Sequence, residues 1–198
     1  MKKRTLLILL AIAIIVGIIT TAGIFAYQEK RYKKLLKFAD AYKAASMNVR
    51  VYFDNTKNNP NAKDCEAAFA TERSVPKSKN GVEIALKELF KGPLTGEKSL
   101  GYSSPFSSKT SNILQGVKIE NKTAYINLLD IRKLMPNVTT SCSSAQFISE
   151  IEKTVKYNTG AENVVIAIDK NPKTFYEWMQ IGCDKKTKNC DAKPFETL

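Results

Sequence analysis

The stretch ALKELFKGPLTGEKSLGY, residues 85–102, decides the fold of this chain. Together with the residues just before it, this stretch spaces apolar side chains at i, i+3, i+4 and i+7, which is the pattern of an amphipathic helix. The side chains at this spacing are Val82, Ala85, Leu86 and Leu89. We predict a helix over residues 81–91, which Gly92 and Pro93 bring to an end.

The second half of the stretch comes close to a nucleotide-binding loop of the form G-x-x-x-x-G-K-[ST]. Counted from Gly92, however, the sixth position holds Glu97, which would place negative charge beside a phosphate. A phosphate loop also opens a helix, whereas Gly92 ends one. We interpret the segment as a corner between two helices, in which Thr95 caps a short turn, Glu97 lies near its positive end and Gly101 closes it.

The segments around this corner carry strand patterns. NVRVYFDN alternates apolar and polar residues, as a half-buried strand does, and NVVIAID is continuously apolar, which indicates a central strand. The predicted strands cover residues 48–55, 66–75, 112–120, 122–129 and 163–169, and the third and fourth form a hairpin. The fold class is therefore α+β, in the order β-β-α-β-β-α-β, with two main helices packed on a mixed or antiparallel sheet.

A second helix is predicted over residues 144–158. Ser143 and Gln146 form a capping-box pattern at its start, and Gly160 closes it. Its inward side is predicted to carry Phe147, Ile148, Ile151 and Val155. Because the sequence singles out no carboxylate pair, we expect the glutamates of both helices to be solvated. They are Glu83, Glu88, Glu150 and Glu152.

Residues 5–27, TLLILLAIAIIVGIITTAGIFAY, form a run without a charged side chain. About 20 apolar residues are enough to cross the hydrocarbon core of a membrane as a helix. The run is also longer than the roughly 7–15 apolar residues of a signal peptide, so we predict an uncleaved transmembrane anchor rather than a cleaved signal. The other predicted segments are a basic flank at 1–4, a basic juxtamembrane stalk at 28–46, a domain at 47–170 and a C-terminal extension at 171–198.

Four cysteines follow the predicted anchor: Cys65, Cys142, Cys183 and Cys190. None forms a C-x-x-C pair, and the sequence has no histidine to complete a mixed zinc site. An even set without metal spacing favours two disulfides in an oxidising compartment, with four free thiols as the alternative. Basic residues flank the anchor on both sides and do not orient it. The cysteines favour a cytoplasmic N-terminus and an extracytoplasmic domain, in the periplasm or at the cell surface.

The formal net charge is +12, and it is unevenly distributed. Residues 1–46 hold nine basic and two acidic side chains, so most of the excess lies beside the anchor, where it suits anionic lipid headgroups. The rest of the chain has no basic run interleaved with aromatic residues, which a nucleic-acid surface would show. The predicted partner is therefore the membrane, through residues 5–27, and nucleic acid is not expected.

The absence of histidine excludes Ser-His-Asp and Cys-His catalysis and H-E-x-x-H zinc sites. Carboxylate or lysine chemistry is not excluded, but no complete catalytic motif occurs. We therefore expect no catalytic residues, no cofactor and no metal. Aromatic residues gather in TFYEWMQ, residues 174–180, where Phe175, Tyr176 and Trp178 could stack on a sugar or, alternatively, cover the sheet.

Several segments together resemble the GerMN domain, which is named from spore germination and sporulation proteins. The resemblance covers about residues 49–170 and is most specific in the corner at 85–102. The extended start VRVYF, the segment that contains Arg73, and the stretches VKIENKTAYINL, SCSSAQFISEIEKTV and VVIAID add to it. The chain departs from the family pattern in having one copy of the domain, no lipoprotein cysteine after the apolar run, and the C-terminal extension.

The resemblance implies an extracytoplasmic α+β module that is not known as an enzyme and that occurs in membrane-anchored or lipoprotein envelope components. It also implies a disulfide between Cys65 and Cys142, which leaves Cys183 and Cys190 to pair with each other.

We therefore expect a non-enzymatic binding or assembly module of a membrane-anchored bacterial envelope protein, contacting an envelope protein or another copy of itself. The alternative is a cell-wall enzyme or carbohydrate-binding protein that uses carboxylates and the Phe175–Trp178 cluster on a cell-wall glycan. A cleft lined by paired acids and these aromatic side chains would favour the alternative.

Overall fold

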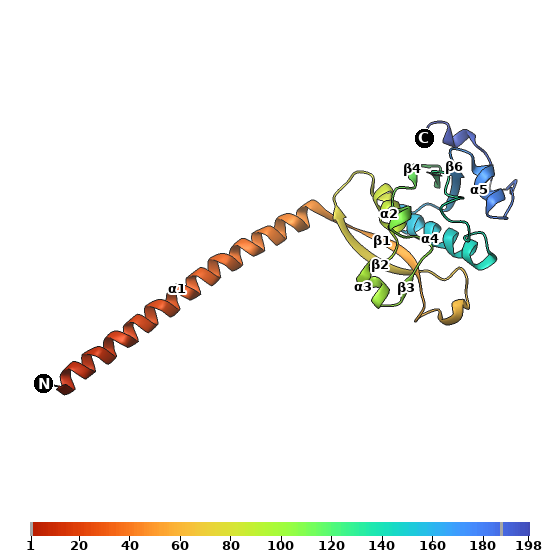
Figure 1. Cartoon of the computed structure of the whole chain (residues 1–198). Coiled ribbons are helices and arrows are strands. Elements are labelled where there is room, and N and C mark those ends of the chain that lie inside the picture. Colours follow the sequence, from red (N-terminus) through yellow and green to blue (C-terminus); the bar gives the residue numbers. More distant parts are fainter. Residues whose placement is uncertain (1, 187) are drawn as a thin grey trace. The chain divides into compact units, whose positions relative to one another are not determined.

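The computed structural model describes the backbone of residues 2–186 and 188–198 (Figure 1). The side chains of residues 2–16, 18, 19, 22 and 141 lie outside the description. The chain divides into two compact units, Met1–Ser46 and Met47–Leu198.

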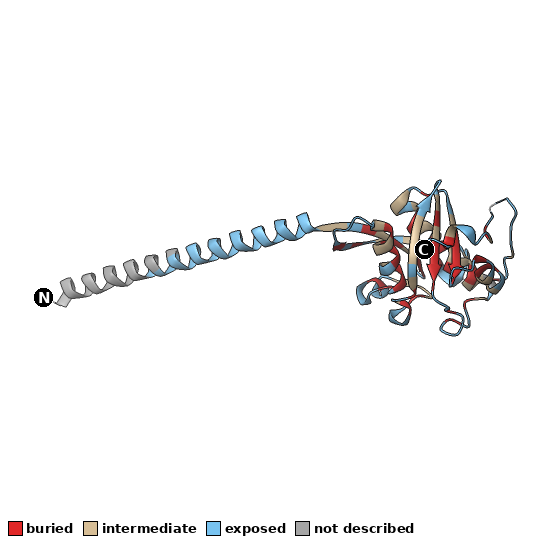
Figure 2. Cartoon of the chain, turned by 90° about the horizontal axis from the view of Figure 1, so that it is seen from above, coloured by how far each residue is buried: buried red, intermediate tan, exposed pale blue. Residues whose placement is uncertain are grey.

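The first unit is one continuous helix, α1 (Lys2–Ala45). Its described side chains, which begin at residue 17, are exposed (Figure 2). In the described part of the chain, no helix is long and apolar enough to cross a membrane. The anchor predicted at residues 5–27 falls mostly on side chains outside the description, so it stays a prediction.

The second unit is an α+β domain, as predicted. Its strands are β1 (Ser46–Asn55), β2 (Phe69–Pro76), β3 (Tyr102–Ser103), β4 (Leu114–Glu120), β5 (Thr123–Leu128) and β6 (Asn163–Ile168). Its α-helices are α2 (Gly81–Phe90), α3 (Thr95–Ser99), α4 (Ser141–Thr159) and α5 (Pro172–Trp178), and short 3-10 turns lie at Pro60–Ala62, Ser108–Thr110 and Lys193–Phe195. The long elements follow the predicted order, and α3, β3 and α5 are added to it.

The strands form two sheets rather than the single sheet that was predicted. One sheet has the order β2-β1-β3, and the other has the order β4-β5-β6. The hairpin of β4 and β5 is confirmed, and its turn residues Asn121 and Lys122 both have a positive φ, as a type I′ turn requires. β6 pairs in parallel with β5 at one side of its sheet, so β6 is not central as predicted. Its continuous burial arises because α4 and α5 both pack against it.

A chain of aromatic contacts runs through the core of the second unit. Phe106 lies between Phe90 of α2 and Phe147 of α4, with ring centroids 5.0 and 4.9 Å apart, and Phe147 also contacts Phe175 of α5. Phe195, near the C-terminus, is fully buried and meets the ring of Tyr125 edge to face. Residues after 170 therefore contribute to the core, and the buried residues of Figure 2 gather where the helices meet the sheets.

Arg73 of β2 organises the corner between α2 and α3. Its guanidinium group is buried, and it donates from Nε and Nη2 to the two carboxylate oxygens of Glu97, at 3.1 and 2.6 Å. It also donates to the main-chain carbonyls of Glu88 and Gly92, at 2.6 and 2.8 Å. Arg73 thus binds a carbonyl in the last turn of α2, the carbonyl of Gly92 just after it, and the acidic side chain at the start of α3.

Glu97 serves the corner in a second way. Its carboxylate accepts the main-chain N–H of Leu94 at 2.6 Å, so Leu94, rather than Thr95, is the cap of α3. Burial alone would raise the pKa of Glu97, but the hydrogen bonds from Arg73 and Leu94 outweigh it and hold the pKa below its ordinary value.

Gly92 is required where α2 ends. Its φ is +71°, and a Cβ at this position would lie 2.2 Å from the carbonyl oxygen of Phe106. Both the left-handed backbone and the close approach of another chain segment therefore need glycine here.

We predict that Glu97→Ala lowers the free energy of unfolding of the chain by about 3–5 kcal/mol, because it removes the carboxylate that accepts two hydrogen bonds from the buried guanidinium of Arg73 and leaves only that of Glu88, at 3.3 Å. The measurement is urea unfolding followed by the fluorescence of Trp178, the only tryptophan. The matched control is Glu162→Ala, which removes an exposed ion pair with Lys122 and is expected to cost less than about 1 kcal/mol. Equal losses in the two variants would contradict the role given to Arg73.

Candidate functional site

Helix α4 is the element on which the candidate site is built. It begins after Thr140, three residues earlier than predicted, and ends at Gly160, whose φ of +71° gives the expected left-handed end. The expected capping box is absent, because the side chain of Gln146 donates to Glu150 instead. Phe147, Ile151 and Val155 are fully buried and form its inward face, as predicted.

A second face of α4 binds the edge of β1. The side chains of Glu150, Thr154 and Asn158 accept the main-chain N–H groups of Asp54, Tyr52 and Arg50, at 3.1, 3.1 and 3.2 Å. Four residues of a helix rise about 6.0 Å and two residues of a strand about 6.6 Å, so the two spacings nearly match. β1 is the middle strand of its sheet, but β3 pairs with it only at Asp54 and Asn55. The ladder of three side chains binds the main chain of β1 from Arg50 to Asp54.

Glu150 lies in a buried polar cluster at one end of this ladder. Besides the N–H of Asp54, its carboxyl group meets the hydroxyl of Ser104 at 2.5 Å and the amide of Gln146 at 3.2 Å. The side chain of Asp54 accepts hydrogen bonds from Asn59 and Ser103. Burial raises the pKa of Glu150 to about 8, and the nearby charge of Asp54 adds to the rise, although the hydrogen bonds oppose it. The expectation that Glu150 is solvated was therefore wrong.

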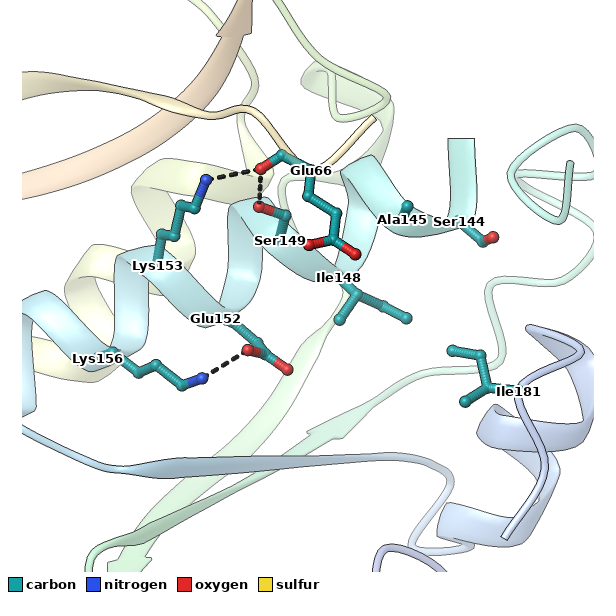
Figure 3. A pocket seen from close by; sticks show the side chains of 9 residues that line it. All are labelled: Glu66, Ser144, Ala145, Ile148, Ser149, Glu152, Lys153, Lys156 and Ile181. Carbon is teal, nitrogen blue, oxygen red and sulfur yellow. Dashed lines mark hydrogen bonds and ion pairs between the residues drawn. The ribbon is translucent and has the colours of Figure 1, made fainter. Parts of the chain in front are cut away.

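The third face of α4 lines a surface groove of about 440 Å³ (Figure 3). From α4 come residues at helical spacing, namely Ser144, Ala145, Ile148, Ser149, Glu152, Lys153 and Lys156. Glu66, which precedes β2, and Ile181, which follows α5, complete the lining. Figure 3 shows Ile148 and Ile181 facing each other across the groove, with the charged side chains along α4 and at Glu66.

Hydrogen bonds fix the polar wall of the groove. The hydroxyl of Ser149 and the ammonium group of Lys153 both donate to the main-chain carbonyl of Glu66, each at 2.6 Å. Lys156 pairs with Glu152 at 2.6 Å. The loop before β2 is thereby held against α4, and two carboxylates and two ammonium groups surround the apolar side chains.

A disulfide bond stands next to each wall of the groove. Cys65 is joined to Cys142, beside Glu66 and at the start of α4, and Cys183 is joined to Cys190, just after Ile181. The first is the pair that the resemblance implies, and the second joins the two cysteines that remain, as expected. The first crosslink fixes the position of the Glu66 loop on α4, and the second closes the turn that follows Ile181.

The polar side chains of the groove are held by hydrogen bonds and ion pairs within the chain. Ser149 and Lys153 each donate one hydrogen bond to the same carbonyl oxygen, that of Glu66. Among the described residues, no group of three or more Asp, Glu or Cys side chains is placed to hold a metal ion. What remains is an apolar floor with charges of both signs at its rim.

The aromatic cluster of α5 does not form a ligand platform. Phe175 and Tyr176 are buried, and Phe175 packs against Phe147, Tyr176 and Trp178. Trp178 is half-buried at the edge of the core. Of the two interpretations left open by the sequence, covering the sheet is the one that the structure supports.

The sequence did not identify the groove. Ile148 was assigned to the inward face of α4, but it is half-buried and lines the groove, and Ile181 lies in a segment for which no element was predicted. The sequence did contain one signal for the groove. Ala145 and Ile148 are spaced i, i+3, and they lie on a different side of the helix from Phe147, Ile151 and Val155. Glu152 is partly exposed, as expected, whereas Glu88 is largely buried beside Arg73.

Comparison with known proteins gives one match. A family model described as Germane, sporulation and spore germination, matches residues 50–174, well over half of the chain. This confirms the resemblance to the GerMN type. No curated protein and no solved structure matches the chain.

We predict that Glu150 makes the stability of the chain depend on pH. Its pKa is raised from 4.5 to about 8, so its contribution to stability is complete below about pH 4.5 and is lost as the pH rises to about 8, by up to about 1.4 kcal/mol per pH unit. Glu150→Gln carries no proton to lose and keeps an acceptor for the N–H of Asp54. Its free energy of unfolding, relative to that of the wild type, should therefore rise steadily from pH 5 to pH 8.

The measurement is urea unfolding of both proteins at several pH values. Glu162→Gln, at an exposed position, is the control and should differ from the wild type by a constant amount. A constant difference for Glu150→Gln as well would show that Glu150 is ionised throughout this range.

Proposed function

The chain belongs to the Germane family of sporulation and spore germination, and we propose that residues 47–198 are a non-enzymatic binding or assembly module outside the cytoplasm. In this proposal, residues 5–27 hold the module to the membrane, and its partner is another protein of the cell envelope.

The observation that carries the proposal is the groove on α4. Its floor holds Ile148 and Ile181, and Ile181 keeps 54% of its surface exposed, which is a large fraction for an isoleucine. Its rim carries Glu152 and Lys156 on one side and Glu66 on the other. An apolar centre within a polar rim is the usual anatomy of a protein–protein contact.

The location outside the cytoplasm is supported by the cysteines. Both pairs are joined, and the described residues include no free cysteine. Disulfides of this kind persist in oxidising compartments and are rare where thiols are kept reduced. The uncharged run at residues 5–27 precedes the module in the chain and supports its attachment to the membrane.

The glycan alternative lacks the observation that would favour it. None of the residues that line the groove is aromatic, whereas sugar sites commonly stack the ring on an aromatic face. Phe175 and Tyr176, the expected platform, are buried.

Site-specific photo-crosslinking in the native host tests the groove as the contact. A photoreactive residue at Ile148 or Ile181 is expected to give one discrete crosslinked product, because a partner side chain would lie on the apolar floor. The same residue at Ile119, which is 46% exposed on β4, is the matched control and should give no such product. The proposal fails if the groove positions give no discrete product or if Ile119 gives the same one.

We also predict that all four cysteines of the chain are protected when it is isolated from its native host without reductant. Alkylation followed by mass spectrometry should add no label before reduction and four labels after it, because both pairs form in an oxidising compartment. Four labels before reduction would place the module in a reducing compartment.

A further inference from the structure

The part of α1 that follows the predicted anchor carries a groove of about 460 Å³ on one face. Its lining residues are Tyr27, Lys30, Arg31, Lys34, Leu35 and Phe38. They recur every three or four positions, so they project from the same side of the helix. Three cations are thus combined with two aromatic rings in a small area.

The three cations of this face are free to bind an anion. In the described part of α1, Glu29 pairs with Lys33, which lies on another side of the helix, and Lys30, Arg31 and Lys34 form no ion pair. Lys34 instead lies over the ring of Phe38, with its Nζ 6.0 Å from the ring centroid. Residues 28–45 hold six basic and two acidic side chains, so the face suits a negatively charged surface better than a second copy of itself.

The depth of these residues matches the headgroup layer of a bilayer. The uncharged run ends at Tyr27, and α1 continues without a break, so at about 1.5 Å per residue Lys30, Arg31 and Lys34 lie about 5, 6 and 11 Å further along the helix. The headgroup layer is about 5–8 Å thick on each side of the hydrocarbon core. Side chains of a helix also tilt toward its N-terminus, which here is the membrane side.

Tyr27 strengthens this assignment. Tyrosine is enriched at membrane interfaces, where its ring lies among the headgroups and its hydroxyl group meets water. Its position at the end of the uncharged run, on the face that carries the cations, places an aromatic ring at the boundary between the hydrocarbon core and the headgroups.

We propose that the face of α1 formed by Tyr27, Lys30, Arg31 and Lys34 binds the headgroup phosphates of anionic phospholipids. This inference rests on the proposed membrane anchor and assigns a ligand to the segment beyond it. It also explains why basic residues occur on both sides of the uncharged run. Those that follow the run would bind lipid headgroups and would not determine the orientation of the anchor.

The test uses the full chain reconstituted in vesicles with equal amounts of phosphatidylglycerol and phosphatidylcholine. After a carbonate wash and extraction in mild detergent, the lipids that remain bound are counted by native mass spectrometry. The test variant is K30Q/R31Q, and the matched control is K37Q/K43Q, which removes the same charge from positions about 15 and 24 Å beyond Tyr27, outside the headgroup layer. Glutamine keeps the helix propensity of these positions.

The wild type should retain more phosphatidylglycerol than phosphatidylcholine. Because each basic side chain near an anionic surface contributes about a fivefold gain in affinity, the test variant should lose at least fivefold in this ratio, and the control should stay within about twofold of the wild type. An unchanged ratio in the test variant, or an equal loss in the control, would overturn the proposal.

The carbonate wash separates this inference from the proposed anchor. If the wash releases the wild type, the anchor is wrong, and flotation of the released chain with the same vesicles then measures the lipid preference of the same two variants. If the wash leaves all three proteins in the membrane, the lipid ratio alone decides.

Discussion

The buried guanidinium group of Arg73 is the interaction on which the second unit depends. A group that cannot lose its charge has been taken out of water, and it is stable there because the carboxylates of Glu97 and Glu88 and the carbonyls of Glu88 and Gly92 bind it together. These acceptors lie on α2, on α3 and at Gly92 between them, so a residue of β2 binds the chain where it leaves one helix and where it enters the next. Phe90, the last residue of α2, packs on Phe106 beside this corner.

Helix α4 shows how one element can serve the core, the sheet edge and the surface together. Its apolar face completes the core at Phe147, its middle face binds β1, and its outer face carries the groove. Because the first two faces fix the helix on two sides, the groove residues project from a rigid support. A binding surface on such an element loses little conformational freedom when it is occupied.

Much of the fold could be predicted from the sequence, because the spacing of apolar residues and the residues that end an element are local features of the chain. The spacing of Leu86 and Leu89 and the stop at Gly92 were enough for α2, and the turn at Asn121 was enough for the hairpin. The contact between α4 and β1 could not be predicted, because it depends on the side chains of Thr154 and Asn158 reaching a strand about 100 residues earlier in the chain. The groove was missed for the same reason, since Glu66 and Ile181 come together only in the folded chain.

The ladder between α4 and β1 also constrains the length of the chain. The helix falls short of the strand by about 0.6 Å at each step, and the rungs compensate with side chains of different length: threonine in the middle, asparagine and glutamate at the ends. Substitutions on the other faces of α4 leave this matching intact, whereas a residue inserted or deleted between two rungs would move the rungs on either side of it out of register with each other. Variation in this part of the molecule is therefore expected as exchanges of side chains, and changes in chain length are expected only in the connecting loops.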